Sequence, residues 1–163
     1  LCKCQALFTK FGGHRQAAGV SLKEENVQRF RETINSLCTL TEEDLQMKVY
    51  IDMQVPFPYL TEDLIEQFQV MEPFGKGNKR PLFAEKDLKV IQPKIVGKNE
   101  NVLQCILEDK QGNRMKAVYF GDVKTCLKEM LAGKVTAVTY FPSINEYMGR
   151  RSIQLTIVNY QKK

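Results

Sequence analysis

The order of apolar segments after Pro81 constrains the fold of this 163-residue chain more than any other feature. Short stretches rich in Val, Ile, Leu, Tyr and Phe recur there between turn residues, and one stretch instead has the spacing of an amphipathic helix. The predicted strands are 82–96 (one bent strand or two pieces), 102–107, 115–120, 135–141 and 153–158, and the predicted helix is 122–131. Three strands, a helix and two strands are the order of a five-stranded OB barrel. We therefore predict an OB-fold β-barrel with one helix over residues 81–163.

Residues 41–80 predict a strand and a helix that lead into this barrel. Apolar and polar residues alternate from Leu45 to Val55, as in a half-buried strand, and the prolines that follow end it. Thr61 is the expected N-cap of a helix. The apolar stripe of this helix is Leu64, Ile65, Phe68 and Met71. A constrained loop of Pro, Gly and Asn follows, and its positive charges are Lys76, Lys79 and Arg80.

Near the start of the chain, Gly12, Gly13, His14 and Arg15 outline a phosphate-sized pocket. Adjacent glycines let backbone N–H groups converge on one anion, and the planar guanidinium of an arginine suits a phosphate. A simple turn with a structural histidine is the alternative interpretation. A capping box of Ser21 and Glu24 then predicts the start of a helix. The apolar face of that helix is Val27, Phe30, Ile34 and Leu37.

The net charge of +5 is unevenly distributed along the chain. Residues 1–72 hold 7 basic and 11 acidic side chains, whereas residues 73–163 hold 17 basic and 8 acidic ones. A module as basic as the second part attracts polyanions, of which nucleic acid is the commonest in the cytoplasm. A lysine-rich surface that only confers solubility is the alternative.

Five scattered cysteines and a single histidine offer no common zinc spacing, so we expect no metal site in this chain. Free thiols in a reducing cytoplasm are expected, with Cys38, Cys105 and Cys126 as small buried residues. No apolar run approaches the roughly 20 residues that span a bilayer, so no membrane association is expected. The chain begins with Leu1 and has no signal-peptide layout, which predicts a cytoplasmic protein represented by a fragment.

Two motifs resemble known families. The string Gly12-Gly13-His14-Arg15-Gln16-Ala17-Ala18-Gly19 is similar to the GGHxxAAG signature of the DHHA1 domain in the DHH phosphoesterase superfamily. The segment 71–81, with Glu-Pro-Phe-Gly-x-Gly-Asn, resembles the junction between DHHA1 and OB domains in RecJ-type single-strand-specific exonucleases. That family usually has proline after the Asn, whereas Lys79 stands there in this chain, so the local turn can differ.

The resemblance implies an α+β chain: a partial DHHA1 α/β segment at 1–40, a connecting strand, helix and basic loop at 41–80, and the OB barrel at 81–163. It implies the substrate-binding C-terminal portion of a 5′ to 3′ exonuclease for single-stranded DNA, acting in recombination and repair. The implied cofactor is Mn or Mg, bound by a DHH domain. No DHH motif is present here, so the fragment alone is expected to be inactive and to hold no catalytic residue. Implied partners are single-stranded DNA and, as candidates, single-strand binding protein or a helicase.

Roles follow for individual residues. By the resemblance, Gly12 and Gly13 would contact the substrate through the backbone, and His14 and Arg15 would contact its phosphate. OB barrels bind single strands with a basic groove and aromatic platforms. The predicted nucleic-acid-binding residues are Lys76, Lys79, Arg80, Lys94, Lys98, Arg114, Lys116, Tyr147, Arg150 and Arg151. Adjacent aromatics point to opposite faces of a strand, so about half of Tyr119, Phe120, Tyr140 and Phe141 are expected to be platforms.

Two other functions remain open from the sequence. One is a DHHA1-type nanoRNase or cyclic-dinucleotide phosphodiesterase, which residues 81–163 argue against because those enzymes generally end soon after the glycine motif. The other is a non-catalytic OB-fold module that binds single-stranded DNA, which the glycine motif argues against.

Overall fold

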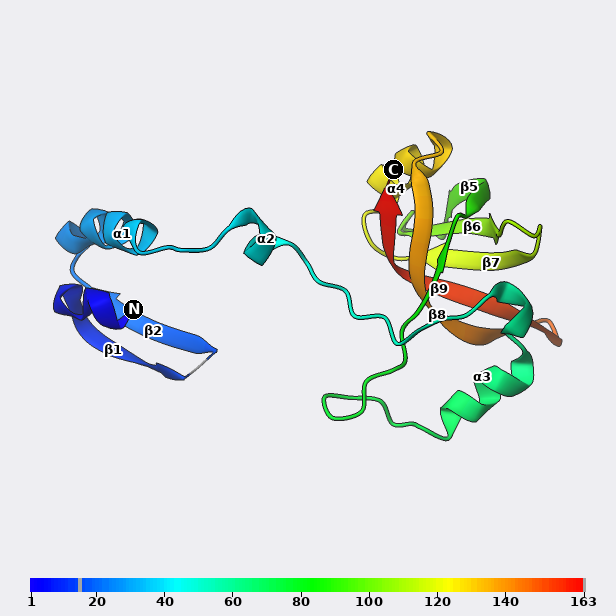
Figure 1. The fold of residues 1–163 in the computed structure, drawn as a ribbon, viewed down its shortest axis with the longest axis horizontal. Helices are drawn as coiled ribbons and strands as arrows, with labels where there is room; N and C mark the ends of the chain where they lie inside the picture. The colour runs from blue at the N-terminus through cyan, green and yellow to red at the C-terminus, as the bar shows by residue number, and fades with distance from the viewer. Residues whose placement is uncertain (15, 163) are drawn as a thin grey trace. The chain divides into compact units, whose positions relative to one another are not determined.

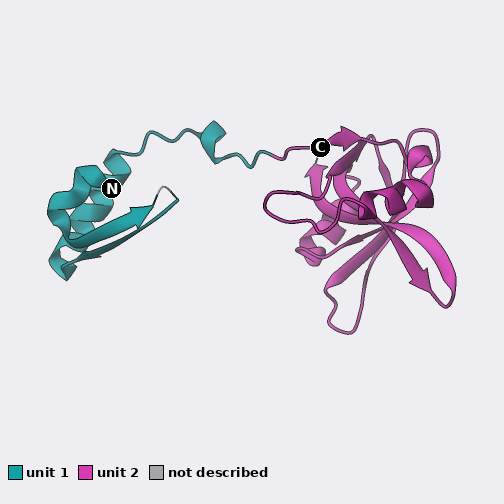
Figure 2. Ribbon diagram, turned by 90° about the horizontal axis from the view of Figure 1, so that it is seen from below, with its two compact units in different colours: residues 1–48 teal, residues 49–163 magenta. Residues whose placement is uncertain are grey.

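The computed structural model describes residues 1–14 and 16–162 and divides the chain into two compact units, 1–48 and 49–163 (Figures 1 and 2). Within the described residues, no helix has the length and apolar character needed to cross a membrane.

The first unit is a β-hairpin with short helices. Its elements are η1 (Cys2–Leu7), β1 (Phe8–His14), β2 (Ala17–Leu22), η2 (Glu24–Asn26), α1 (Val27–Ser36) and α2 (Glu42–Leu45). Phe8 packs against Phe30 of α1, with ring centroids 5.3 Å apart. Cys4 is the one buried hydrophobic residue among the described positions of this unit, so most of the apolar face of α1 is open to solvent.

Two predictions for this unit are wrong in detail. The paired glycines lie within strand β1 rather than in a loop, because Gly12 and Gly13 pair with Gly19 and Ala18 across the hairpin. The predicted capping box fails because Ser21 is in β2, and α1 follows η2 with Asn26 at its N-cap and no side-chain cap.

The second unit is dominated by one seven-stranded sheet (Figure 1). Its elements are β3 (Met53–Gln54), η3 (Phe57–Tyr59), α3 (Glu62–Gln69), β4 (Phe83–Lys86), β5 (Lys89–Val96), β6 (Val102–Glu108), β7 (Arg114–Tyr119), α4 (Val123–Leu131), β8 (Val135–Tyr147) and β9 (Arg150–Lys162). The predicted order of strands and helix is confirmed.

The strand order β3-β4-β8-β9-β7-β6-β5 explains how the sheet curves into a barrel. Strands β4 and β5 are two pieces of one bent strand, separated only by Asp87 and Leu88. Asp87 has a φ of 60°, so the chain turns sharply there. The first piece pairs with β8 and the second with β6, so the two sides of the sheet are joined through one continuous segment. This is the strand arrangement of an OB fold.

Strands β8 and β9 are longer than predicted. Residues 142–152 were expected to include a loop, but Tyr147 pairs directly with Arg150 across a two-residue turn. Met148 and Gly149 both have positive φ, at 49° and 71°, as a type I′ hairpin turn requires. Tyr147, Arg150 and Arg151 therefore lie on strand ends, where their positions are fixed by pairing.

The core lies inside the barrel and includes residues that precede it. Leu103, Leu107 and Leu155 are fully buried, and so is Tyr140. The Tyr140 hydroxyl donates a 2.9 Å hydrogen bond to the backbone carbonyl of Val55, which is buried as well. Of the strand predicted over 45–55, only Met53–Gln54 is paired, because β4 offers it just two partners.

The cysteine predictions are confirmed in part. Cys105 and Cys126 are buried as expected, whereas Cys38 is exposed and Cys4 is buried instead. Burial raises the pKa of the Cys105 thiol to about 12 and that of the Cys126 thiol to about 11, so both stay protonated at neutral pH.

Helix α4 begins with a cap that can be tested. The Asp122 carboxylate accepts a 3.1 Å hydrogen bond from the backbone N–H of Thr125, and hydrogen bonding by Thr125 lowers the pKa of Asp122. Asp122→Ala is expected to lower Tm by about 2 to 6 °C at pH 7. Because this carboxylate has a depressed pKa when folded, the difference from wild type should shrink as the pH falls below 3.8. Asp122→Asn keeps a side-chain oxygen that can accept the capping hydrogen bond. If this variant lowers Tm as much as the alanine variant does, loss of the cap is not the cause.

Candidate nucleic-acid interface

One outward surface of the barrel is built by side chains that neighbour each other across five strands. On β6, Leu103, Cys105 and Leu107 point into the core, so Gln104 and Ile106 point outward. Backbone pairing then aligns two rows across the sheet. We call this surface the outer face; its rows are Lys94–Gln104–Val118–Thr156–Phe141 and Ile106–Lys116–Gln154–Ser143.

Two lysines lie at the β5–β7 end of the outer face. Lys94 pairs with Gln104 on β6, and Lys116 pairs with Ile106 on the same strand. Both lysines are exposed, and they line a shared hollow of about 150 Å³ with Gln92, Gln104, Cys105 and Ile106. Register therefore brings together two positive charges that are 22 positions apart in the sequence, which suits the phosphates of a polyanion.

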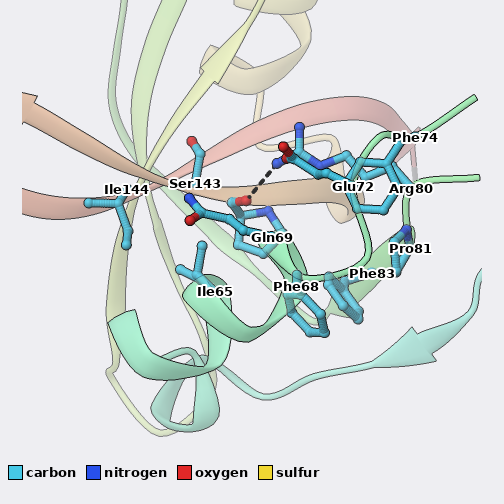
Figure 3. Close-up of a pocket in the computed structure, with 11 residues that line it drawn as sticks. Ile65, Phe68, Gln69, Glu72, Phe74, Arg80, Pro81, Phe83, Ser143 and Ile144 are labelled. Atoms are coloured by element: carbon cyan, nitrogen blue, oxygen red, sulfur yellow. Dashed lines mark hydrogen bonds between the residues drawn. The ribbon is translucent and has the colours of Figure 1, made fainter.

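An aromatic ring and an arginine lie at the β8 end. The Arg80 guanidinium carbon is 4.9 Å from the centroid of the Phe141 ring, within the range of a cation–π contact. One guanidinium nitrogen of Arg80 also donates a 3.0 Å hydrogen bond to the backbone carbonyl of Pro142 (Figure 3). Four inter-strand spacings separate Lys94 from Phe141, which is about 19 Å. The outer face thus has cations at both ends and a stacking surface at one.

Several other predicted residues lie in loops and at a hairpin tip of the second unit. Lys98 is exposed in the loop between β5 and β6, next to Gly97, whose φ is 92°. Lys76 and Lys79 are exposed in the loop after α3. At the tip of the β8–β9 hairpin, Tyr147 is 67% exposed beside Arg150.

Two predicted arginines are already paired with carboxylates. The Arg114 Nε lies 2.6 Å from a Glu108 carboxylate oxygen, and both residues are on outward positions of neighbouring strands. The Arg151 guanidinium pairs with Glu62 at 3.3 Å and with Glu66, both on α3. The hydrogen bond with Glu66 raises the pKa of Arg151 above its ordinary value. These two arginines have less charge to offer a phosphate than Lys94 or Lys116.

The four aromatics divide as strand alternation requires. Tyr140 is fully buried, and Tyr119 packs edge-on against Tyr160 with ring centroids 5.8 Å apart. Phe120 is 59% exposed, and Phe141 is half-buried on the outer face.

The glycine segment forms a separate candidate site on the first unit. A Cβ at Gly13 would lie 2.5 Å from the Ala18 Cα, so the close approach of the two strands requires glycine there. Gly12 pairs with Gly19, and no atom lies within 4 Å of its would-be Cβ, so the space beside it is open. His14 is exposed beside a hollow that Phe11, Gly13 and Ala18 also line. Arg15 lies outside the described residues. Among the residues that the structure describes, no group of three or more His, Cys, Asp or Glu could hold a metal ion.

The uncharged polar members of the outer face were not predicted from the sequence; they are Gln104, Thr156, Gln154 and Ser143. Their outward direction follows from alternation with buried neighbours, but their alignment into rows depends on pairing registers.

The strand order, with β4 and β5 as one bent strand that pairs with both sides of the sheet, defines an OB-fold domain. The family model described as RecJ OB domain matches residues 51–159. The chain therefore belongs to the RecJ OB-domain family.

Individual relatives agree with this assignment. The chain is 31% identical over 153 residues to the single-stranded-DNA-specific exonuclease RecJ of Haemophilus influenzae, covering 93% of this chain and 26% of that protein. RecJ of Escherichia coli is 29% identical over 155 residues, covering 94% and 26%. The chain thus spans about a quarter of the length of these curated relatives.

The crystal structure of Thermus thermophilus RecJ in complex with Mg²⁺ has a similar fold, with a TM-score of 0.70 at 19% sequence identity. The match covers all of this chain and 24% of that one. A second structure of the same protein, in complex with Mn²⁺, matches equally well.

Proposed function

We propose that this chain is the strand-holding portion of a RecJ-type exonuclease, and that its outer face binds single-stranded DNA. The observation that carries the proposal is the arrangement of the outer face. Lys94 shares a row with Phe141 across five paired strands, Lys116 lies in the adjacent row, and Arg80 covers the Phe141 ring. Backbone phosphates need positive charge, and an aromatic face stacks on any base. The single-strand specificity in the names of the relatives agrees with this substrate class.

Within this proposal, the predicted residues take different roles. Lys94, Lys98 and Lys116 contact phosphates, and Arg80 with Phe141 forms a platform for a base. Tyr147 and Arg150 extend the surface at the hairpin tip, and Lys76 and Lys79 add charge beside it. Arg114 and Arg151 mainly hold the barrel and α3 together through their carboxylate partners.

A second part of the proposal concerns catalysis and rests on the first unit, residues 1–48. Residues 1–40 would be part of a DHHA1 domain, joined by 41–80 to the barrel at 81–163. Gly12, Gly13, His14 and Arg15 would then approach the phosphate near the bond that is cleaved. Helix α1 leaves Val27, Ile34 and Leu37 each at least 37% exposed, which suits a helix covered by the rest of a larger domain.

The catalytic metal ions would be held outside this chain. The described residues bring no cluster of metal ligands together, and the crystal structures of T. thermophilus RecJ are complexes with Mg²⁺ and with Mn²⁺. We propose that a metal site elsewhere in the full-length nuclease activates the attacking water, and that this chain alone binds DNA without cleaving it. The role of the full-length protein would be cytoplasmic DNA recombination and repair.

Salt dependence tests the binding proposal. If Lys94, Lys98 and Lys116 each contact one phosphate, log K for an oligo-dT should fall with log salt concentration with a slope of about −2.1. Fluorescence anisotropy titrations of a labelled oligo-dT at several salt concentrations measure this slope. An affinity that does not change with salt would contradict an electrostatic interface.

A further inference from the structure

A pocket beside the outer face has no role in the binding proposed so far. It has a volume of about 230 Å³ and lies between α3, the loop that follows α3, and β8 (Figure 3). The residues that line it come from three segments far apart in the sequence, 65–74, 80–83 and 142–144. An apolar cavity of about 150 Å³ holds one benzene ring, so this pocket has room for a single planar ring system.

The floor and walls of the pocket are suited to a flat apolar surface. The rings of Phe68 and Phe83 lie together at its floor, with centroids 5.2 Å apart. Ile65 from α3 and Ile144 from β8 lie on one side of it, and Phe74 from the loop lies on the other (Figure 3). Aromatic and aliphatic walls of this kind bury the face of a nucleobase.

The rim of the pocket carries hydrogen-bonding groups rather than a cluster of one charge. Gln69 offers an amide and Glu72 a carboxylate, while the Ser143 hydroxyl donates to the Gln154 carbonyl at 3.2 Å and can still accept. Arg80 uses one of its N–H groups on Pro142, so others remain to donate. The carboxylate would repel a phosphate, whereas it can accept from the amino or imino N–H of a base.

The loop that supplies Phe74 and Glu72 is held in place before any ligand binds. The Asn78 side-chain amide donates to the carbonyls of Met71, at 2.5 Å, and Pro73, at 3.2 Å. Backbone hydrogen bonds between Gly75 and Asn78 close the turn, at 2.7 and 3.2 Å. A preformed wall loses less entropy when a ligand enters.

The pocket is continuous with the outer face. Ser143 belongs to both, and it pairs with Gln154, which pairs with Lys116. Arg80 lines the pocket while its guanidinium covers Phe141. We propose that this pocket holds one nucleobase of the single strand bound on the outer face, an inference that rests on the proposed function.

A fluorescent base tests the proposal. Oligo-dT strands carrying one 2-aminopurine, moved along the strand position by position, are bound to the 163-residue chain at saturating protein. Stacking in the pocket should quench the emission strongly at one or two positions. Phe74→Ala should restore that emission and weaken binding about 5- to 150-fold, the range for losing one base–aromatic stack.

Matched variants separate the possible outcomes. Phe120→Ala removes an exposed ring outside the pocket and should leave the quenching unchanged. Glu72→Ala removes an exposed rim residue, so folding should be kept while quenching at the same position weakens; the Tm of each variant checks this. Salt-dependent binding with no Phe74-dependent quenching would contradict base binding in the pocket and would still support strand binding on the outer face. Absence of any binding to the strand would overturn both.

Discussion

Replacing both Lys94 and Lys116 by Glu should weaken binding of oligo-dT by about 10- to 100-fold at low salt. The two lysines line one hollow on the outer face, so the double variant removes two phosphate contacts and adds two repulsive charges at the same place. The slope of log K against log salt should become less steep by about 1.4, since each lost contact removes about 0.7. Anisotropy titrations over a range of salt concentrations give both quantities.

The matched control changes the net charge equally at another place. Lys124→Glu with Lys128→Glu alters two exposed residues on α4, neither of which lies on the outer face. If the outer face binds the strand locally, this variant should keep most of the affinity and the original salt slope. Equal losses in the two double variants would mean that only the overall charge of the barrel matters, and would contradict a defined interface.

The barrel was predictable because its strands are short, alternating and bounded by turn residues. Strand β6 alternates three buried residues with outward ones, and the turn after it is closed by a hydrogen bond from the Gly112 N–H to the Asp109 carbonyl. The Asp109 carboxylate accepts hydrogen bonds from the N–H groups of Gln111 and Asn113, so contacts between near neighbours in sequence stabilise the turn. Features that depend on neighbours in sequence are the ones that a sequence reveals.

Features that depend on distant partners were not predictable. The polar end of β8, including Asn145 and Glu146, looks like a loop by composition, but it pairs with β9 because a two-residue turn fixes the register. Conversely, the alternation from Leu45 to Val55 predicts a long strand, yet only Met53 and Gln54 of that stretch pair with β4. A strand forms where a partner edge exists, and the position of that edge is set by the whole sheet.

The same distinction applies to the candidate interface. Lys94 and Lys116 were selected by residue type and strand position, and the structure adds that register places them in one hollow. The pairing of Arg151 with Glu66 joins residues 85 positions apart, so no local pattern could reveal that this arginine is compensated. Residue types indicate which groups can bind DNA, whereas the sheet decides which of them lie together.

Phe57→Ala should reduce the free energy of unfolding of the barrel unit by about 3 to 5 kcal/mol. Phe57 precedes the predicted barrel by more than 20 residues, yet it is only 1% exposed and packs against Tyr140, with ring centroids 6.4 Å apart. Val55 and Leu60 are buried in the same core cluster. The segment before α3 is therefore expected to be part of the barrel core, and removing the ring leaves a cavity that its rigid neighbours cannot fill.

Tyr59→Ala is the matched control, because Tyr59 lies in the same short helix η3 but is 69% exposed. Its removal should change the free energy of unfolding by no more than about 0.5 kcal/mol. The midpoint and slope of urea denaturation curves, recorded for the two variants and the wild type, give the difference in free energy of unfolding. Similar small losses for both variants would show that residues 55–60 only connect other parts of the chain. A large loss for Phe57→Ala alone would show that a barrel shortened to begin at residue 81 lacks part of its own core.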